Sequence, residues 1–230
     1  MSNLLRAVAV LMFAATSWTV LAQTFTTEFD GTENPLSEGG AWSHAGLDWT
    51  KVQKANGIAF GTQTGNGGYD DSYAVLSGFG PDQSASAKVH IASSVDRSCT
   101  HEMEILLRWA DSNHNARGYE INISFDGGYS QIVRWNGAYG DFTVLGDGTY
   151  TGLKEGDTFQ ASIVGDLIKI SVNGNPIAQV RDSKFTTGNP GVGFFRRACG
   201  TNADVGFQNF SATGNGGRAA PLPPTNVTAN

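Results

Sequence analysis

Three features of this 230-residue sequence predict an all-β fold. Short runs of residues alternate between apolar and polar, turn-forming dipeptides separate these runs, and no stretch keeps a helical apolar period over a dozen residues. Many short strands joined by Gly, Asn and Asp turns are typical of a two-sheet antiparallel β-sandwich of the jelly-roll kind. We therefore expect a jelly-roll sandwich.

The predicted strands follow one another almost without interruption through the middle of the chain. They span residues 24–30, 57–61, 72–79, 86–93, 101–109, 118–125, 130–137, 142–146, 158–165, 167–174, 176–182, 191–197 and 205–213. The tight-turn pairs Gly165-Asp166 and Asn173-Gly174 predict three consecutive antiparallel strands between residues 158 and 182. The run 126–128, Asp-Gly-Gly, similarly joins the strands on either side of it.

The two ends of the chain differ in composition from this middle part. Residues 1–22 combine an early Arg6 with an apolar run from Ala7 to Ala15 and small residues near Ala22, which indicates a secretory signal peptide. A membrane anchor is the alternative, but the apolar run is short for a span. Residues 214–230 are Gly-rich and then Pro-rich, as in a linker or tail. The sequence thus predicts one secreted domain, residues 23–213, in an extracellular or periplasmic compartment.

Charge and cysteine content narrow the class of partner. The net charge of −6 and the absence of a basic run argue against nucleic acid, which requires clustered Lys and Arg. We expect a monomer that does not associate with a membrane once the signal peptide is removed.

In an oxidising compartment, Cys99 and Cys199 are expected to form a disulfide, with two buried free thiols as the alternative.

The segment 101–109, HEMEILLRW, carries two carboxylates and a guanidinium on one predicted strand. Side chains alternate across a strand, so a polar and an apolar face are expected. The expected polar face holds Glu102, Glu104, Leu106 and Arg108. The expected apolar face holds Met103, Ile105, Leu107 and Trp109. Such a polar row is typical of a glycan-cleaving centre, a glycan-binding floor or an ordinary solvated face.

The strand 118–125 predicts a wider polar floor if it lies beside 101–109, because Glu120 and Asn122 alternate with apolar residues. Carboxylates, amides and guanidinium groups hold sugar hydroxyls by paired hydrogen bonds, and aromatic rings stack on sugar faces. The candidate ligand-binding residues are Glu104, Arg108, Glu120, Asn122, Gln131, Arg134 and Trp135. The other rings expected to flank the groove are Trp42, Trp49, Tyr69, Tyr129 and Tyr139.

The order of motifs along residues 24–213 also points to a known superfamily. The motifs run TEFDGTENPLSEGGAW, DSYAVLSGF, RGYEINISFDGG, QIVRWNG, LKEGDTFQASIVGDLIKISVNG, RDSKFTTGNPGVGFF and VGFQNFSAT. This order resembles the concanavalin A-like lectin/glucanase superfamily, in its laminin-G-like jelly-roll branch. The resemblance implies that the first and last strands pair. It leaves function open, because the fold serves lectins, binding modules, hydrolases, lyases and interaction domains.

The resemblance suggests two catalytic templates, and each is incomplete here. The glucanases carry E-x-D-x-E or E-x-D-x-x-E on a central strand, but after Glu102 and Glu104 the required second Glu is replaced by Leu106 or Leu107. The alginate-lyase-like branch carries R-x-E-L-R and Q-I-H. Residues 104–108 and 131–133 are similar to these, but Val133 replaces the histidine that serves as the base.

The remaining catalytic candidates are therefore weak: Glu102, Glu104 and Tyr119, with Tyr129 as a further proton carrier. A structural calcium is conceivable, since related jelly rolls often join their first and last strands through a cation. Asp30 and Asp204 are the nearest acidic candidates, and two surface aspartates are the alternative.

Taken together, the residues favour a secreted module that binds a polysaccharide or oligosaccharide on a concave sheet face, without catalysis of its own. A polysaccharide lyase or glycoside hydrolase of the same fold is the first alternative. A laminin-G-like protein-interaction domain is the second.

Overall fold

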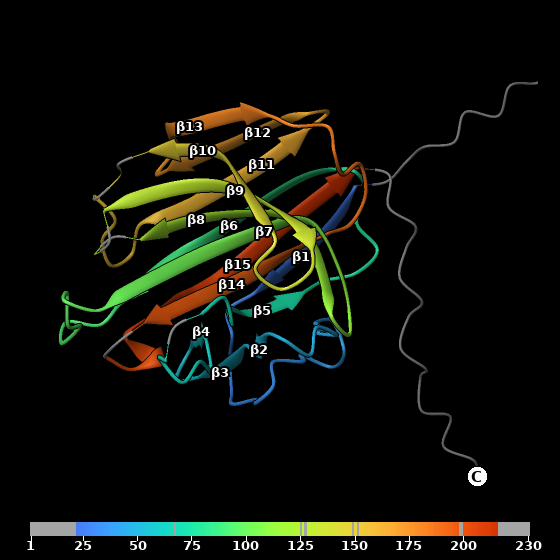
Figure 1. The fold of residues 1–230 in the computed structure, drawn as a ribbon. Coiled ribbons are helices and arrows are strands. Elements are labelled where there is room, and N and C mark those ends of the chain that lie inside the picture. The colour runs from blue at the N-terminus through green and yellow to red at the C-terminus, as the bar shows by residue number, and fades with distance from the viewer. Residues whose placement is uncertain are drawn as a thin grey trace, which may run out of the picture.

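The computed structural model describes residues 22–66, 68–124, 126, 128–148, 150, 152–197 and 200–215. Within these ranges the chain forms two packed β-sheets and one 3-10 helix, η1, at Asn202–Asp204 (Figure 1). The expected all-β sandwich is confirmed. None of the described helical structure has the length and apolarity that a membrane crossing requires.

The strands follow the predicted order, except that the two short strands β2 and β3 were not predicted. They are β1 Gln23–Thr27, β2 Thr50–Lys51, β3 Gln53–Ala55, β4 Ile58–Phe60, β5 Ser72–Val75, β6 Asp82–Ile91, β7 Thr100–Ser112, β8 Asn115–Ser124, β9 Tyr129–Gly137, β10 Phe142–Gly148, β11 Thr158–Val164, β12 Leu167–Val172, β13 Asn175–Arg181, β14 Asn189–Arg197 and β15 Val205–Asn215.

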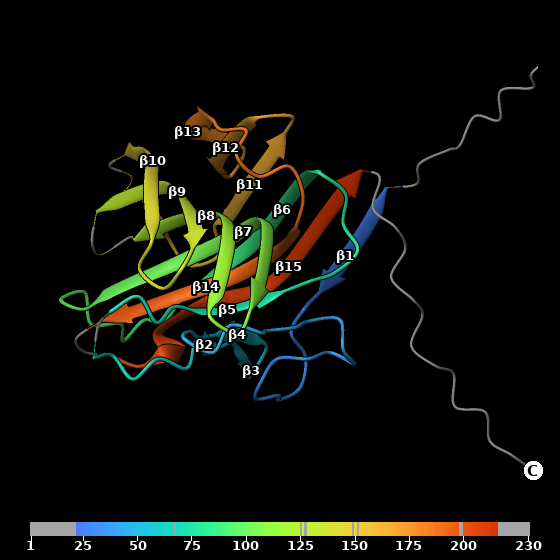
Figure 2. The ribbon, with the colours of Figure 1, turned by 45° about the vertical axis from the view of Figure 1, so that its right-hand side comes forward.

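Two sheets of similar size share these strands. The eight-stranded sheet has the order β13-β12-β11-β6-β15-β4-β3, with β1 paired to β15. The seven-stranded sheet has the order β10-β9-β8-β7-β14-β5-β2. The segment between β1 and β5 lies along one margin of the sandwich in both views (Figures 1 and 2). Strands distant in sequence therefore lie next to each other at the centre of each sheet.

The local pairings predicted from the turns are confirmed. Strands β11, β12 and β13 are consecutive and antiparallel, as are β7, β8 and β9. The turn between β12 and β13 has positive φ at both central residues, 52° at Asn173 and 76° at Gly174. Asn and Gly tolerate this backbone best, so the dipeptide sets the register of the hairpin.

The expected pairing of the first and last strands is also confirmed. Strands β1 and β15 run antiparallel, with Gln23 opposite Gly214 and Thr27 opposite Phe210. The last strand continues to Asn215, so the first two residues of the expected tail belong to the sheet. Residues 1–21 and 216–230 lie outside the described part of the chain, so the signal peptide and the rest of the tail stay predictions.

Apolar side chains form two separate clusters. The larger one fills the space between the sheets, with Met103, Ile105 and Leu107 of β7 packed in the same cluster as Ile163 and Phe207 of the other sheet. The smaller one lies on the outer face of the seven-stranded sheet and contains Trp49, Tyr73, Val75, Leu106, Trp109, Ala116, Val133 and Trp135. The outer face is thus partly covered and is not an ordinary solvated surface.

A bulge in β7 overturns part of the predicted alternation. The pairing of β7 with β8 shifts between Leu107 and Ala110, and Arg108 has a φ of 48°. A bulge adds one residue to a strand and so shifts the facing of the side chains beyond it. Trp109 therefore packs with Leu106 in the outer cluster. The prediction that it shares the face of Met103 is wrong.

Arg108 itself does not share the polar face, so that prediction is also wrong. Its side chain is 3% exposed, and its guanidinium donates to the backbone carbonyls of Pro81 at 2.7 Å, Phe185 at 2.8 Å and Gly165 at 2.8 Å. Asp82 lies 3.6 Å away as an ion-pair partner. Arg108 thereby ties together three segments at one end of the sandwich.

Cys99 is buried and immediately precedes β7. Its expected partner, Cys199, lies outside the described residues. The disulfide between them therefore stays a prediction.

Replacing Arg108 with Ala is expected to lower the free energy of unfolding by at least about 3 kcal/mol, because the buried guanidinium and its bonds to three backbone carbonyls are lost. Urea unfolding measures this change. Arg181→Ala is the matched control, since the Arg181 side chain is 66% exposed and pairs with Asp166 at the surface. A loss there of more than about 1 kcal/mol, or equal losses in both variants, would contradict the assignment.

Candidate functional site

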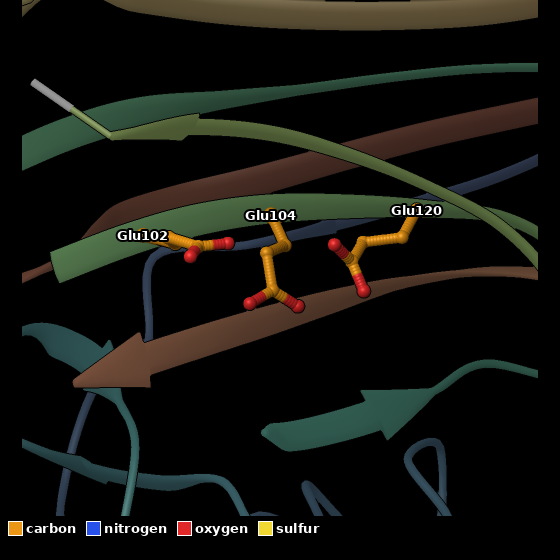
Figure 3. Close-up of side chains that lie close together, drawn as sticks. All are labelled: Glu102, Glu104 and Glu120. Atoms are coloured by element: carbon orange, nitrogen blue, oxygen red, sulfur yellow. The ribbon is translucent and has the colours of Figure 1, made fainter. Parts of the chain in front are cut away.

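Three glutamates meet on the outer face of the seven-stranded sheet. Glu102 and Glu104 are two residues apart on β7 and so face the same way, and Glu120 of β8 lies opposite Leu106 of β7. One carboxyl oxygen from each glutamate lies within 4.8 Å of the others. Figure 3 shows the carboxyl group of Glu104 between those of Glu102 and Glu120. We call these three residues the glutamate cluster.

Strand register puts small and polar residues around the cluster. Glu104 is opposite Asn122 on one side and Gly193 on the other, and Asn122 is opposite Gln131 of β9. A Cβ atom on Gly193 would lie 2.1 Å from Oε2 of Glu104. The absence of a side chain at Gly193 therefore leaves the space that the Glu104 carboxyl occupies.

The three carboxyl groups have different hydrogen-bond environments. Glu120 accepts from Nδ2 of Asn122 at 2.8 Å and from Nε1 of Trp135 at 2.6 Å. Glu102 accepts from the hydroxyl of Tyr129. Glu104 is 1% exposed, and its Oε1 has no hydrogen-bond partner among the described residues.

These environments raise the carboxyl pKa values above their ordinary range. Burial, followed by the charge of Glu120, raises the pKa of Glu102 to about 8. Burial and the charges of Glu120, Asp71 and Glu102 raise the pKa of Glu104 well above its ordinary value. Burial also raises the pKa of Glu120, although the donors Asn122 and Trp135 oppose the rise. Protons on the cluster are thus held most firmly at Glu104 and Glu102.

Asp71 adds a fourth carboxyl group from another part of the chain. It directly precedes β5, and burial together with the charges of Glu120 and Glu102 raises its pKa well above the ordinary value. Arg197, which is exposed, is the cationic side chain among the described residues that line the same cavity. The site therefore carries more acidic groups than basic ones.

The glutamate cluster adjoins a cavity of about 340 Å³, which we call the carboxyl groove. Its described lining residues are Gly68, Tyr69, Asp71, Thr100, Glu102, Glu120, Asn122, Tyr129, Gln131, Val133, Trp135, Phe142, Phe195 and Arg197. This volume is in the range of small-molecule sites. The groove combines an acidic and amide floor with an aromatic wall.

Most of the rings expected beside the groove form one cluster. Tyr69 stacks edge-on against Phe142 at 5.3 Å and Tyr139 at 6.1 Å, and Trp135 lies 5.5 Å from Phe142. Tyr69 is 47% exposed, so part of its ring is open to a ligand. Trp42 is the exception, since it packs in the inter-sheet core near Phe25 and Phe210.

The structure brings five of the seven predicted ligand-binding residues together at this site. They are Glu104, Glu120, Asn122, Gln131 and Trp135. Arg108 lies instead at one end of the sandwich, where it donates to three backbone carbonyls. Arg134 faces away from the groove: it lies on the face of Ile132, and its guanidinium donates to Asp182 and Asn136.

Of the predicted catalytic and metal-binding residues, some lie at this site and others lie elsewhere in the fold. Glu102 and Glu104 lie in the glutamate cluster, and Tyr129 lies beside it. Tyr119 is buried in the inter-sheet core, where its hydroxyl donates to Asp182. Asp204 accepts from Thr201 at η1, and Asp30 is exposed. Neither aspartate belongs to the described acidic group that is close enough to hold an ion.

The sequence reasoning missed Asp71, Phe142 and Arg197. Asp71 precedes β5, and β5 reaches the site only because it pairs with β14, which in turn pairs with β7. No local pattern in the sequence predicts this order of strands. Phe142 was recognisable as a strand residue, but its position beside Trp135 depends on the β9–β10 register.

Comparison with known proteins gives structural matches only. No family model matches the chain, and no curated protein matches its sequence. The fold is similar to that of the carbohydrate-binding module CBM66 from Bacillus subtilis, with a TM-score of 0.53, 16% identity, and coverage of 78% of this chain and 96% of that one.

The fold is also similar to that of the kappa-carrageenase from Pseudoalteromonas carrageenovora, solved with an oligotetrasaccharide of kappa-carrageenan. The TM-score is 0.54 and the identity 9%, covering 87% of this chain and 98% of that one. The chain therefore has a concanavalin A-like jelly-roll fold, as the resemblance predicted. Because a binding module and an enzyme share this fold, the matches leave the choice between them to the site.

The raised pKa values predict that the free energy of unfolding decreases as the pH rises from about 5 to about 8, in a buffer that contains a metal chelator. Over this window the unfolded carboxyls have lost protons that the native Glu102 and Glu104 still hold, so the native state binds more protons. The slope is up to about 1.4 kcal/mol per pH unit for each group. Thermal unfolding at several pH values measures it.

Glu104→Gln is expected to make this slope shallower, because it removes one of the buried titrating groups. Glu28→Gln, at an exposed carboxyl, serves as the control and is expected to leave the slope unchanged. A wild-type stability that rises from about pH 5 to about pH 8 would contradict the assigned pKa directions.

Proposed function

We propose that this jelly roll binds an oligosaccharide or polysaccharide chain in the carboxyl groove. One observation carries the proposal: a polar floor and a partly exposed aromatic ring line the same cavity. A sugar presents hydroxyl groups at its edge and C–H groups on its face. A site that offers both hydrogen-bonding groups and a ring matches both surfaces.

The floor supplies hydrogen bonds of both kinds. The carboxyl group of Glu102 accepts hydrogen bonds, and in the absence of a bound cation its raised pKa of about 8 favours the protonated form, which also donates. The amide side chains of Asn122 and Gln131 do the same, and the Oδ1 atom of Asn122 is buried without a described partner. Sugar hydroxyls also donate and accept, so they satisfy such groups without a net charge on the ligand.

The aromatic wall supplies the stacking surface. Tyr69 is held against Phe142 and Tyr139, and its backbone N–H donates to the Tyr139 hydroxyl at 2.9 Å. A ring fixed in this way loses little freedom on binding. The hollow, partly polar cavity fits a saccharide better than the flat, apolar-rimmed face expected of a laminin-G-like protein contact.

We also propose that this binding takes place outside the cytoplasm. The support is the signal-peptide pattern of residues 1–22 and the two-cysteine composition. Polysaccharides of cell walls and matrices are found in those compartments. The saccharide's identity is left to the binding assay.

Glycoside hydrolysis is a second candidate, and one observation favours it. The third carboxyl that the glucanase motif lacks at Leu106 is supplied from the next strand by Glu120, which lies directly opposite. With its pKa of about 8, Glu102 suits a general acid, and the two donors to Glu120 oppose the rise that burial causes in the pKa of this second carboxyl group. Retaining glycosidases likewise place two carboxyl groups close together, and here one oxygen of each glutamate lies within 4.8 Å of the others.

Tyr69→Ala is expected to weaken retention on the preferred polysaccharide about three- to tenfold, since it removes one stacking ring. Affinity electrophoresis against a panel of neutral and acidic polysaccharides measures the effect. Val164→Ala is the control: this side chain is 62% exposed on β11 of the other sheet and should not alter retention. Equal retention of the wild type and Tyr69→Ala would show that the Tyr69 ring does not contribute to saccharide binding.

Incubation with the same panel separates binding from cleavage. Retention without new reducing ends supports a binding module. If reducing ends appear, Glu102→Gln and Glu120→Gln are each expected to lower the rate at least about a hundredfold while retention persists. Ultraviolet absorbance of an unsaturated uronate would instead reveal a lyase and would contradict both candidates.

A further inference from the structure

The glutamate cluster contains oxygen atoms that the protein itself does not hydrogen-bond. Oε1 of Glu104 and Oδ1 of Asn122 are both buried without a described partner, on side chains that are 1% and 2% exposed. Buried polar atoms without partners are uncommon, because each costs about 1–3 kcal/mol of desolvation. Two such acceptors, on residues that lie opposite each other in the β7–β8 pairing, indicate that a donor or a cation binds among them.

The second atom belongs to Asn122, a side chain outside the glutamate cluster that also lines the carboxyl groove. The Asn122 amide donates from Nδ2 to Oε1 of Glu120 at 2.8 Å, which fixes the amide next to the glutamates. Asn122 also lies opposite Glu104 in the β7–β8 pairing. Its free oxygen therefore adds a neutral ligand beside three carboxyl groups.

The charge of the site favours a cation over a neutral donor. Three glutamates and the nearby Asp71 contribute carboxyl groups, while the cationic lining residue among those described, Arg197, is exposed. None of the described salt bridges involves any of the three glutamates. A divalent cation bound between the glutamates would offset the negative charge of their carboxylate groups.

The coordination habits of the two common hard cations differ. Ca²⁺ takes about six to eight oxygen ligands in flexible geometry, whereas Mg²⁺ demands near-ideal octahedral geometry and gives up its water reluctantly. The carboxyl oxygens of Glu102, Glu104 and Glu120 lie within 4.8 Å of one another. All the available donors are hard oxygen atoms, which suit Ca²⁺, Mg²⁺ or Mn²⁺ better than the metals that prefer thiolate or imidazole ligands.

We propose that the glutamate cluster binds one Ca²⁺ ion, with Glu102, Glu104 and Glu120 as carboxylate ligands and Oδ1 of Asn122 as a neutral ligand. The side of the ion that faces the carboxyl groove takes its remaining ligands from water. This site differs in position from Asp30 and Asp204, the pair that the sequence suggested for calcium. It does not depend on the saccharide proposal.

The test is a calcium titration of the chelator-treated protein by calorimetry at about pH 8, where the carboxyl groups release protons most readily. No saccharide is present. We expect one ion per chain, a rise in Tm on addition of Ca²⁺, and at least tenfold weaker binding of Mg²⁺. No binding at millimolar Ca²⁺ would overturn the proposal and would leave saccharide binding untouched.

Three variants locate the ion. Glu104→Gln is expected to weaken Ca²⁺ binding at least tenfold, and Glu102→Gln, on a less buried side chain, repeats the test if the first variant folds poorly. Asp204→Asn is the control and should bind Ca²⁺ as the wild type does. Loss of binding in Asp204→Asn with retention in both glutamine variants would overturn the assignment in favour of the other site.

Discussion

The burial of several acidic side chains on one face of the seven-stranded sheet is the constraint on which the functional face depends. The register of β7 with β8 and β14 brings Glu104 over Gly193 and beside Asn122, where little water reaches it. A carboxyl group in such a place must keep its proton or gain a positive partner. In either case the protonation or charge of the face depends on the ligand or ion that binds there. An apolar face of the same shape would have no such dependence.

The same constraint explains why a fold shared with both binding modules and enzymes leaves the function open. The sandwich supplies only a sheet on which side chains from neighbouring strands meet. In the glucanase motif the acidic residues all lie on one strand. Here they are divided between two strands, with Glu102 and Glu104 on β7 and Glu120 on β8. Strand pairing can thus assemble an acidic site that a linear motif search does not find.

Much of the fold could be predicted from the sequence, because alternation and turn chemistry are local. The hairpin at Asn173-Gly174 and the turn between strands 118–125 and 130–137 required only neighbouring residues. Arg108 could not be predicted, because its left-handed backbone and its buried contacts to Pro81 and Phe185 depend on distant segments. Asp71 was missed for a related reason: its place follows from the order of strands and not from the residues around it.

The pairing of β1 with β15 has a consequence for the way the chain reaches its native state. Strand β15 lies inside the eight-stranded sheet, between β6 and β4, and it is the last strand of the described chain. Until it has been synthesised, β6 has an unpaired edge, and such edges favour association with other chains. Strands β6, β11, β12 and β13 can pair without β15, but β1 and β4 cannot join them until the whole domain has been synthesised, and contacts this distant in sequence form slowly.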